Sequence, residues 1–316
     1  TLHVRSLFRL ICKCRKTKSQ GTMALPAYPA KGITVEHFGQ PHTLTHRVYF
    51  KDEEGKVISP FHDIPAFASE DHKIVNMVVE VPRWSNAKME ISKDLPMNPI
   101  IQDSKKGKPR FVHNCFPHHG YIWNYGAIPQ TWEDPTHTDA STDCKGDNDP
   151  IDICDISERV AEIGEIKQVK VLGVMAMIDE GETDWKVIGI DVNDPNAAKI
   201  HDVDDIDKVM PGQIAATNEW FRIYKIPAGK PENTFAFGGE AKNRDFAIKT
   251  IEETMAAWQK MITGAGFDKI STMSTVFEGR DFAKGEAAAE IVAKEPAASA
   301  PAPLDPSVHK WHYIKL

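Results

Sequence analysis

The sequence predicts an α+β protein that is built around a barrel or a strongly curved sheet with flanking helices. Segments in which apolar and polar residues alternate dominate the middle of the chain, whereas a long helical pattern appears only near residue 250. Strands first and helices later is the order typical of α+β folds. With 316 residues, of which 41% are hydrophobic and 26% charged, the chain is long enough to bury its own core.

The first 33 residues are expected to lie outside the globular body, which we place at 34–283. They contain seven Lys or Arg and no Asp or Glu. Basic residues among Leu, Phe and Ile are typical of an organelle-targeting peptide. The favoured alternative is a non-native extension, with Met23 as the true first residue of the protein. The protein is then expected to be cytoplasmic. If residues 1–22 are native, a mitochondrial location is expected instead. Five cysteines without a CxxC pair favour a reducing compartment.

The clearest strand patterns are at 87–91 and in a hairpin of 168–178 and 184–192. In the first, the apolar residues face one way and Lys88 and Glu90 the other, as on a half-buried strand. In the second, two β-rich runs flank the polar sequence DEGET, which predicts a turn between two paired strands.

Three more elements are predicted toward the C-terminus. Residues 219–226 (EWFRIYKI) are predicted to form a strand. A helix is predicted at 246–263, where apolar residues keep helical spacing and Gly264 follows. Residues 284–316 are predicted to form an Ala- and Pro-rich linker and an aromatic tail, which docks on the body or on a partner.

Charge and hydropathy argue against two classes of partner. The formal net charge is −7 and the pI is about 6.0, whereas sequence-independent nucleic-acid binding needs a basic surface. No apolar run approaches the ~20 residues that are needed to cross a bilayer. We therefore expect neither nucleic acid nor a membrane as a partner.

The sequence GDNDPID at 146–152 is the strongest indication of chemistry. Its three carboxylates, on Asp147, Asp149 and Asp152, repel one another unless a cation lies among them or a turn splays them apart. Pro150 favours an extended backbone at Asp149, which would put Asp147 and Asp149 on one face. Oxygen ligands select hard cations, above all Mg²⁺ when the substrate is a phosphate. A solvated acidic turn is the alternative.

Familiar metal and nucleotide motifs do not explain this cluster. An EF-hand that began at Asp147 would need glycine at its sixth position, where Asp152 stands. The chain contains no GxxxxGK[ST], GxGxxG or HExxH sequence.

Two further groups of residues could line the same site. An acidic pair, Asp179 and Asp184, brackets the predicted hairpin turn, and Lys186 shares a strand face with Asp184. Turn capping is the ordinary role of such aspartates. The other group is mixed, and its ordinary roles are a solvated strand face and core tyrosines. It consists of Glu80, Lys88, Glu90, Arg110, Tyr121, Tyr125, Tyr224 and Lys225.

Five motifs in order resemble the soluble inorganic pyrophosphatases of family I, eukaryotic type. They are NMVVEVPRWSNAKME at 76–90, FPHHGYIWNYGAIPQTWE at 116–133, DNDPID, DEGETDWKV and NEWFRIYKIP. The resemblance covers about residues 34–283 and the tail around Trp311. It excludes the basic leader.

The resemblance implies a fold, an assembly and a reaction. The expected fold is a five-stranded OB-like β-barrel with flanking helices and hairpins, in a protein that forms homodimers. The expected reaction is Mg²⁺-dependent hydrolysis of pyrophosphate to two orthophosphates by a metal-activated hydroxide, with several Mg²⁺ ions in each site.

The resemblance also implies a role for each residue of the site. Asp149 orients the attacking water and takes its proton, and Tyr121 is the proton donor, although a phenol with a pKa near ~10 tends to keep its proton. Metal ions are held by Asp147, Asp152, Asp184, Asp179, Glu90 and Glu80. Phosphate groups are bound by Arg110, Lys88, Lys186, Tyr224, Lys225 and Tyr125.

Charge balance explains why such a site would need metal. Seven of these residues are carboxylates and four are cations, which leaves a formal charge of −3. An anionic cleft repels pyrophosphate until divalent cations reverse its sign. Two alternatives stay open: a phosphohydrolase for nucleotides or polyphosphate, which would need a nucleoside pocket in the first case, and an OB-barrel that binds nucleic acid, which would need a basic groove.

Overall fold

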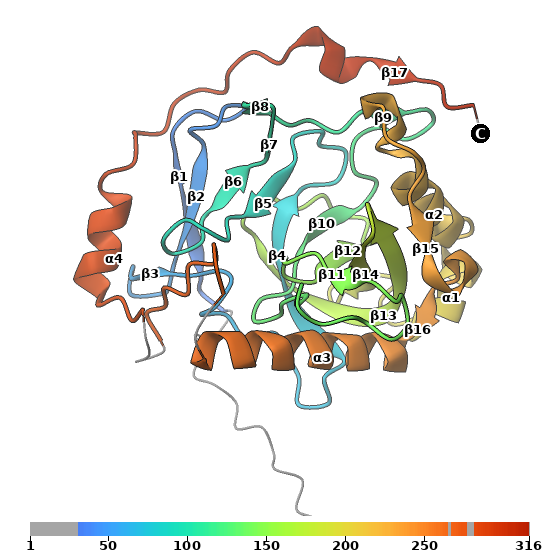
Figure 1. Ribbon diagram of the computed structural model, residues 1–316, viewed down its shortest axis with the longest axis horizontal. Helices are drawn as coiled ribbons and strands as arrows, with labels where there is room; N and C mark the ends of the chain where they lie inside the picture. Colours follow the sequence, from blue (N-terminus) through green and yellow to red (C-terminus); the bar gives the residue numbers. More distant parts are fainter. Residues whose placement is uncertain (1–30, 265–266, 277–280, 316) are drawn as a thin grey trace, which may run out of the picture.

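The computed structural model describes residues 31–264, 267–276 and 281–315, so the basic leader lies almost entirely outside the described residues. Two β-sheets form the body, with helices at its periphery (Figure 1). The larger sheet consists of β4 (Ile74–Val81), β10 (Asn124–Ala127), β11 (Lys145–Gly146), β12 (Asp152–Asp155), β13 (Ile166–Asp179), β14 (Glu182–Asp191), β15 (Thr234–Phe235) and β16 (Lys242–Asn243).

Five strands of this sheet form a closed set of pairings. The order β14, β12, β10, β4, β13 returns to its start because the long strand β13 pairs with β4 in its first half and with β14 along most of its length. A bulge between Val171 and Gly173 bends β13 within its pairing with β14. The predicted hairpin is confirmed: β13 and β14 are antiparallel and are joined at Glu180 and Gly181, which both have positive φ.

The smaller sheet contains β1 (Thr34–Phe38), β2 (Arg47–Lys51), β3 (Val57–Ile58), β5 (Met89–Ile91) and β6 (Ile100–Gln102). The predicted strand at 87–91 is confirmed in β5, where Met89 and Ile91 are buried. Two short pairs complete the β-structure: β7 (Ser104–Lys105) with β8 (Lys108–Pro109), and β9 (Asn114–Cys115) with β17 (Trp311–His312).

The predicted C-terminal helix is confirmed as α3 (Arg244–Thr263), which lies across one end of the larger sheet (Figure 1). Asn243 caps it by accepting a hydrogen bond from the Phe246 N–H at 3.0 Å, and Gly264 ends it. None of the described helices is long and apolar enough to cross a membrane.

The strand predicted at 219–226 is wrong. Helix α2 (Gln213–Ile223) occupies most of this segment and packs beside α1 (Val203–Val209). The alternation in EWFRIYKI is part of a longer helical pattern, since Thr217, Trp220 and Phe221 are all buried. The eight residues 219–226 are too few to distinguish the period of two of a strand from the period of 3.6 of a helix.

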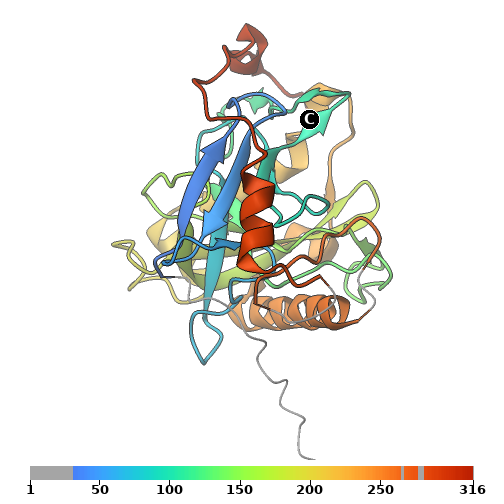
Figure 2. The ribbon, with the colours of Figure 1, turned by 90° about the vertical axis from the view of Figure 1, so that its left-hand side faces the viewer.

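The segment predicted to be a linker starts with a helix, α4 (Gly285–Val292). Ala288 and Val292 are buried there in a cluster with Tyr49 and Met97, and alanine has the highest helix propensity. The tail then runs around the outer edge of the body from α4 to β17 (Figures 1 and 2). Its backbone bonds to Gly39 and Pro41, and β17 pairs with β9, so the tail docks on the body of its own chain.

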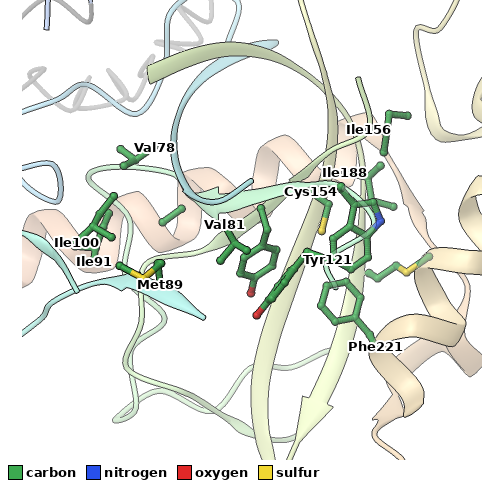
Figure 3. Close-up of a cluster of buried hydrophobic side chains, with 14 of the residues drawn as sticks. Val78, Val81, Met89, Ile91, Ile100, Tyr121, Cys154, Ile156, Ile188 and Phe221 are labelled. Atoms are coloured by element: carbon green, nitrogen blue, oxygen red, sulfur yellow. The ribbon is translucent and has the colours of Figure 1, made fainter. Parts of the chain in front are cut away.

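The main core fills the space between the two sheets and α2. Figure 3 shows part of this cluster, with Met89 and Ile91 at one end, Ile188 and Phe221 at the other, and Tyr121 between them. Apolar side chains from both sheets therefore fix the positions of the strand ends that carry the polar residues described next.

Candidate active site

One hollow of about 100 Å³ is lined by all fourteen residues that the sequence assigns to the site. They come from strands of both sheets, from the residues just before β5 and just after β8, from the loops that precede β10 and β12, and from the segment that follows α2. The residues are Glu80, Lys88, Glu90, Arg110, Tyr121, Tyr125, Asp147, Asp149, Asp152, Asp179, Asp184, Lys186, Tyr224 and Lys225.

The acidic loop before β12 turns at Asn148, so the continuous extended path from Asp147 to Asp149, which was to put both on one face, is wrong at that residue. Asn148 has a φ of 71°, and the Asp147 Oδ1 accepts a hydrogen bond from the Asp149 N–H at 3.0 Å. Such a side-chain bond stabilises a turn in place of an extended strand. Asp147 and Asp149 nevertheless line the same hollow.

Strand β14 presents Asp184 and Lys186 on one face, as the period of two predicts. The Lys186 Nζ lies 2.5 Å from the Asp152 Oδ2, contacts the Asp184 Oδ1, and donates to the Tyr125 hydroxyl at 3.0 Å. Burial alone would lower the pKa of Lys186, but these two carboxylates outweigh it and raise that pKa well above its usual value. Lys186 is therefore a fixed cation.

The remaining cations of the hollow are also held by carboxylates. Lys88 lies 2.7 Å from Glu90 and 3.4 Å from Asp103, and Arg110 lies 2.8 Å from the same Asp103. Lys225 lies 2.5 Å from Asp179. Asp103 was not predicted from the sequence, because it is placed by backbone hydrogen bonds: its N–H donates to the Lys88 carbonyl and its carbonyl accepts from the Arg110 N–H.

A trio of acidic residues lies at the hollow: Asp147 and Asp184 line it, and Glu133 lies beside them. Carboxylate oxygens of Glu133, Asp147 and Asp184 lie within 4.8 Å of one another. Burial, followed by the charges of the other two, raises the pKa of Glu133 well above its usual value. The pKa of Asp147 is also raised by burial and then by Asp149, and that of Asp184 is raised to about 7, chiefly by burial.

This trio fits a hard divalent cation. Glu133 is 3% exposed, and its Oε1 accepts the Trp185 N–H at 3.0 Å. Its Oε2 is buried without a hydrogen-bond partner among the described residues. Buried carboxylates that repel one another and leave an oxygen unsatisfied are the arrangement that a bound cation would relieve.

Glu133 and Lys93 complete the site and were missed by the sequence analysis. Lys93 lies 2.5 Å from the Asp149 Oδ1. Glu133 reaches the site through backbone bonds, because its N–H donates to Asp149 and its carbonyl accepts from Asn148, each at 2.9 Å. These bonds join segments more than ten residues apart, and no local sequence pattern reports them.

Tyr121 keeps its phenolic proton in the neutral range. It is 2% exposed, and burial raises its pKa to about 12. Burial likewise raises the pKa of Tyr125 and of Tyr224. All three side chains therefore act as hydrogen-bond donors at neutral pH.

Comparison with known proteins gives this geometry a family. The profile of inorganic pyrophosphatase matches residues 77–259. The chain is 58% identical over 278 residues to the inorganic pyrophosphatase of Candida albicans, with 87% of this chain and 96% of that protein covered. It is 56% identical over 283 residues to that of Yarrowia lipolytica, with 89% and 97% covered.

The solved structure of inorganic pyrophosphatase from Schistosoma japonicum superposes with a TM-score of 0.84 and 46% identity, covering 89% of this chain and 100% of that one. The matches span nearly the whole length of these relatives and include every stretch that contributes to the hollow. The chain belongs to the soluble inorganic pyrophosphatases of family I, of the eukaryotic type.

Proposed function

We propose that the fourteen-residue hollow is the catalytic centre in which this inorganic pyrophosphatase hydrolyses pyrophosphate to two orthophosphates, and that it does so with Mg²⁺. The observation that carries the proposal is the convergence of acidic, basic and phenolic side chains from distant segments in one hollow. When bound, Mg²⁺ would neutralise the carboxylates and lower the pKa of water. The residues proposed to hold it are Asp147, Asp152, Asp184, Asp179, Glu90 and Glu80, joined by Glu133 beside Asp147 and Asp184.

The chain's own groups divide into proton transfer and phosphate binding. Asp149 accepts the proton of the attacking water, and Lys93, 2.5 Å away, orients its carboxylate. Tyr121 donates a hydrogen bond to the departing phosphate. The phosphates are bound by Arg110, Lys88, Lys186, Tyr224, Lys225 and Tyr125.

Phosphate release from pyrophosphate, measured with Mg²⁺ and with EDTA, tests this proposal. We expect turnover with Mg²⁺ and none in EDTA, and inhibition by excess Ca²⁺, which accepts a larger and looser coordination shell than Mg²⁺. Full turnover in EDTA would contradict it.

Three finer expectations belong to the same proposal. The closed pairings of β4, β10, β12, β14 and β13 support an OB-like five-stranded barrel. The catalytic domain is taken as 34–283. A cytoplasmic location is proposed, and import of a reporter that is fused to residues 1–30 into mitochondria would overturn it.

A homodimer is proposed through an aromatic patch of Trp84, Phe116, Trp311 and Tyr313, in which Trp84 is connected through His119: the two line one hollow, and the His119 ring lies 5.9 Å from that of Trp311. The side chains of Trp84, Phe116, Trp311 and Tyr313 are 57%, 54%, 38% and 76% exposed, respectively. The ring of Phe116 lies 5.7 Å from that of Trp311 and 5.4 Å from that of Tyr313. A cluster of exposed aromatic rings is unusual on a monomer, and a second copy would bury it.

Light scattering after size exclusion tests the dimer. The double variant Trp84→Ser, Trp311→Ser is expected to run as a monomer, whereas Phe282→Ser, at a site 37% exposed, is expected to stay dimeric. A dimeric double variant would show that the patch is not the interface.

A further inference from the structure

A pair of histidines lies on the smaller sheet, and neither of them lines the catalytic hollow. The His37 Nδ1 is 3.2 Å from the His46 Nε2, and the two rings stack with their centroids 5.5 Å apart. His37 lies on β1 opposite Val48 of β2, and His46 comes two residues before Val48, so both histidines lie on the Val48 face. His46 is 3% exposed, and the fold therefore fixes one ring of the pair.

The separation of the two nitrogens matches that of two ligands on one metal ion. Zn²⁺ binds histidine nitrogen at about 2.0–2.1 Å in tetrahedral sites, which places two such nitrogens roughly 3.3–3.4 Å apart. A hydrogen bond from one ring to the other also gives 3.2 Å. The two arrangements differ in the protons, because with a metal ion between them each neutral ring carries its proton on its other nitrogen.

Both rings are in the form that binds metal at neutral pH. The pKa of His46 is lowered to about 4, chiefly by burial. The charges of His37, His42 and Arg47 lower it further, although the Arg47 guanidinium donates to two backbone carbonyls. The pKa of His37 is lowered by burial, against the charge of Glu162, which raises it. Metal ions bind neutral imidazole, so neither ring has to lose a proton first.

A third histidine has the tautomer of a metal ligand. The His42 Nδ1 lies 3.0 Å from the Ala302 carbonyl oxygen. Because a carbonyl only accepts, in the neutral ring that nitrogen carries the proton and Nε2 carries the lone pair. Histidines that bind metal typically donate their other N–H to a carbonyl or a carboxylate in this way. His42 and His46 line one hollow of about 280 Å³, which Trp84 and His119 also line, so an ion has a route to the pair.

A carboxylate reaches the same place from another segment. A Cβ at Gly164 would lie 2.8 Å from the Val35 Cγ1 and 3.3 Å from the Val48 Cγ1, so the loop before β13 covers the face of the sheet that carries His37. Glu162, two residues earlier in that loop, is exposed, and its charge acts on His37. The histidine pair therefore has an oxygen ligand within electrostatic reach.

We propose that His37 and His46 are the two principal ligands of a binding site for one Zn²⁺ ion, with His42 and Glu162 as further ligands. Within the described residues, neither of the further ligands completes a three-ligand group with the pair, so binding includes a side-chain movement of one of them. Imidazole nitrogen suits Zn²⁺ whereas Mg²⁺ selects oxygen, so this site and the catalytic hollow take different ions. The bound ion would join β1 to the turn before β2 and, through the bond from His42 to Ala302, to the docked tail.

The first experiment uses Co²⁺ as a spectroscopic substitute for Zn²⁺. The full-length protein is saturated with Mg²⁺, so that the carboxylates of the catalytic hollow are occupied, and Co²⁺ is then titrated in. Co²⁺ that is bound by imidazoles in a tetrahedral site absorbs visible light more strongly than octahedral Co²⁺ among oxygen ligands. We expect one equivalent of the strong absorption in the wild type and none in His37→Gln, His46→Gln.

The matched control removes two histidines from other parts of the surface. His137 and His201 are exposed and lie in separate loops. His137→Gln, His201→Gln is expected to keep the full Co²⁺ absorption. An equal loss in this variant would show that Co²⁺ binds scattered surface histidines, and it would overturn a defined site.

The second experiment measures Zn²⁺ affinity by competition with a chromophoric chelator in excess Mg²⁺. We expect the affinity to fall about tenfold or more in His37→Gln, and by less in His42→Gln. The His37 ring is accessible to solvent, so His37→Gln is expected to fold, with the Tm of the wild type when no Zn²⁺ is present. Unchanged Zn²⁺ affinity in the folded His37→Gln would mean that the pair is only a hydrogen bond, and the proposal would then be wrong.

Discussion

Two clusters of charged residues lie at opposite ends of the same strands. At one end, Asp152 of β12, Asp184 of β14 and Asp147 line the hollow, and the carboxylate of Glu133 lies within 4.8 Å of those of Asp147 and Asp184. At the other end, Asp155 of β12 and Asp191 of β14 surround Lys167 of β13. Lys167 and Asp155 are fully buried at the side chain, and the Lys167 Nζ lies 2.5 Å from Asp155 and 3.0 Å from Asp191.

The clusters differ in how completely the protein satisfies their oxygens. Asp155 accepts from Lys167, the Asn124 amide, and the backbone N–H groups of Ser157 and Asp191. Glu133, in contrast, keeps a buried oxygen without a partner among the described residues. A buried carboxylate has a structural role where the protein supplies hydrogen-bond donors to its oxygens. Where the protein supplies too few donors, the carboxylate can bind an external cation.

The largest expected effect separates metal binding from proton transfer in the cluster at the hollow, the open cluster, next to which Asp149 lies. Asp149→Asn is expected to lower kcat by about 10²–10⁴ at saturating Mg²⁺, because it removes the proton acceptor. Its rate should still rise at higher pH as hydroxide forms unaided. Asp147→Asn is the matched variant, and extra Mg²⁺ should restore part of its rate. If Mg²⁺ restores Asp149→Asn to the wild-type rate, Asp149 is only another ligand.

The next effect tests the cluster of Lys167, Asp155 and Asp191, the closed cluster. Lys167→Met leaves two buried carboxylates without their cation, and removal of one partner from a buried ion pair costs about 3–5 kcal/mol. We expect the free energy of unfolding in urea to fall by that amount. The Mg²⁺ affinity of the folded variant should match the wild type, and a weaker Mg²⁺ affinity would mean that the two ends are coupled.

A smaller effect of opposite sign is expected in the open cluster without metal. The raised pKa of Glu133 means that its folded form binds a proton more tightly than its unfolded form, so its contribution to stability is lost as pH rises above about 4.3. In EDTA at neutral pH, Glu133→Gln should therefore stabilise the protein, by about 1 kcal/mol. Thermal melts at several pH values measure this, and Mg²⁺ titrations should show weaker binding. Destabilisation in EDTA would contradict it.

The smallest effect is expected at the exposed rim of the closed cluster. The Arg159 side chain is 55% exposed, bonds to Glu165, and lies 3.8 Å from Asp191. Exposed pairs contribute little, so Arg159→Ala should change the free energy of unfolding by at most about 0.5 kcal/mol. A loss as large as that of Lys167→Met would show that the rim, and not burial, holds the cluster together.

Local patterns predicted the elements that position the site. The alternation in β13 and β14 gave their hairpin, the spacing of apolar residues gave α3, and family motifs gave the fourteen residues that line the hollow. The strand at 219–226 failed because a short helical face of Trp220, Phe221 and Ile223 imitates alternation.

The residues that were missed depend on contacts between distant segments. Glu133 is brought to Asp147 by backbone bonds to the acidic turn, and Asp103 is brought to Lys88 and Arg110 by backbone bonds to both residues. The structural role of Asp155 on β12 likewise depends on Lys167, which lies on a different strand, β13. An isolated aspartate in the sequence carries no record of which donors will surround it.

The docked tail has a consequence for the order in which the protein is made. Residues 296–302 and β17 satisfy backbone groups at Gly39, Pro41 and β9, which are synthesised long before them. At about 5–20 residues per second, the ribosome takes a few seconds to pass from residue 283 to residue 312. During that interval the nascent body presents an unpaired edge at β9, a surface on which chaperones or a second nascent chain could bind before the tail covers it.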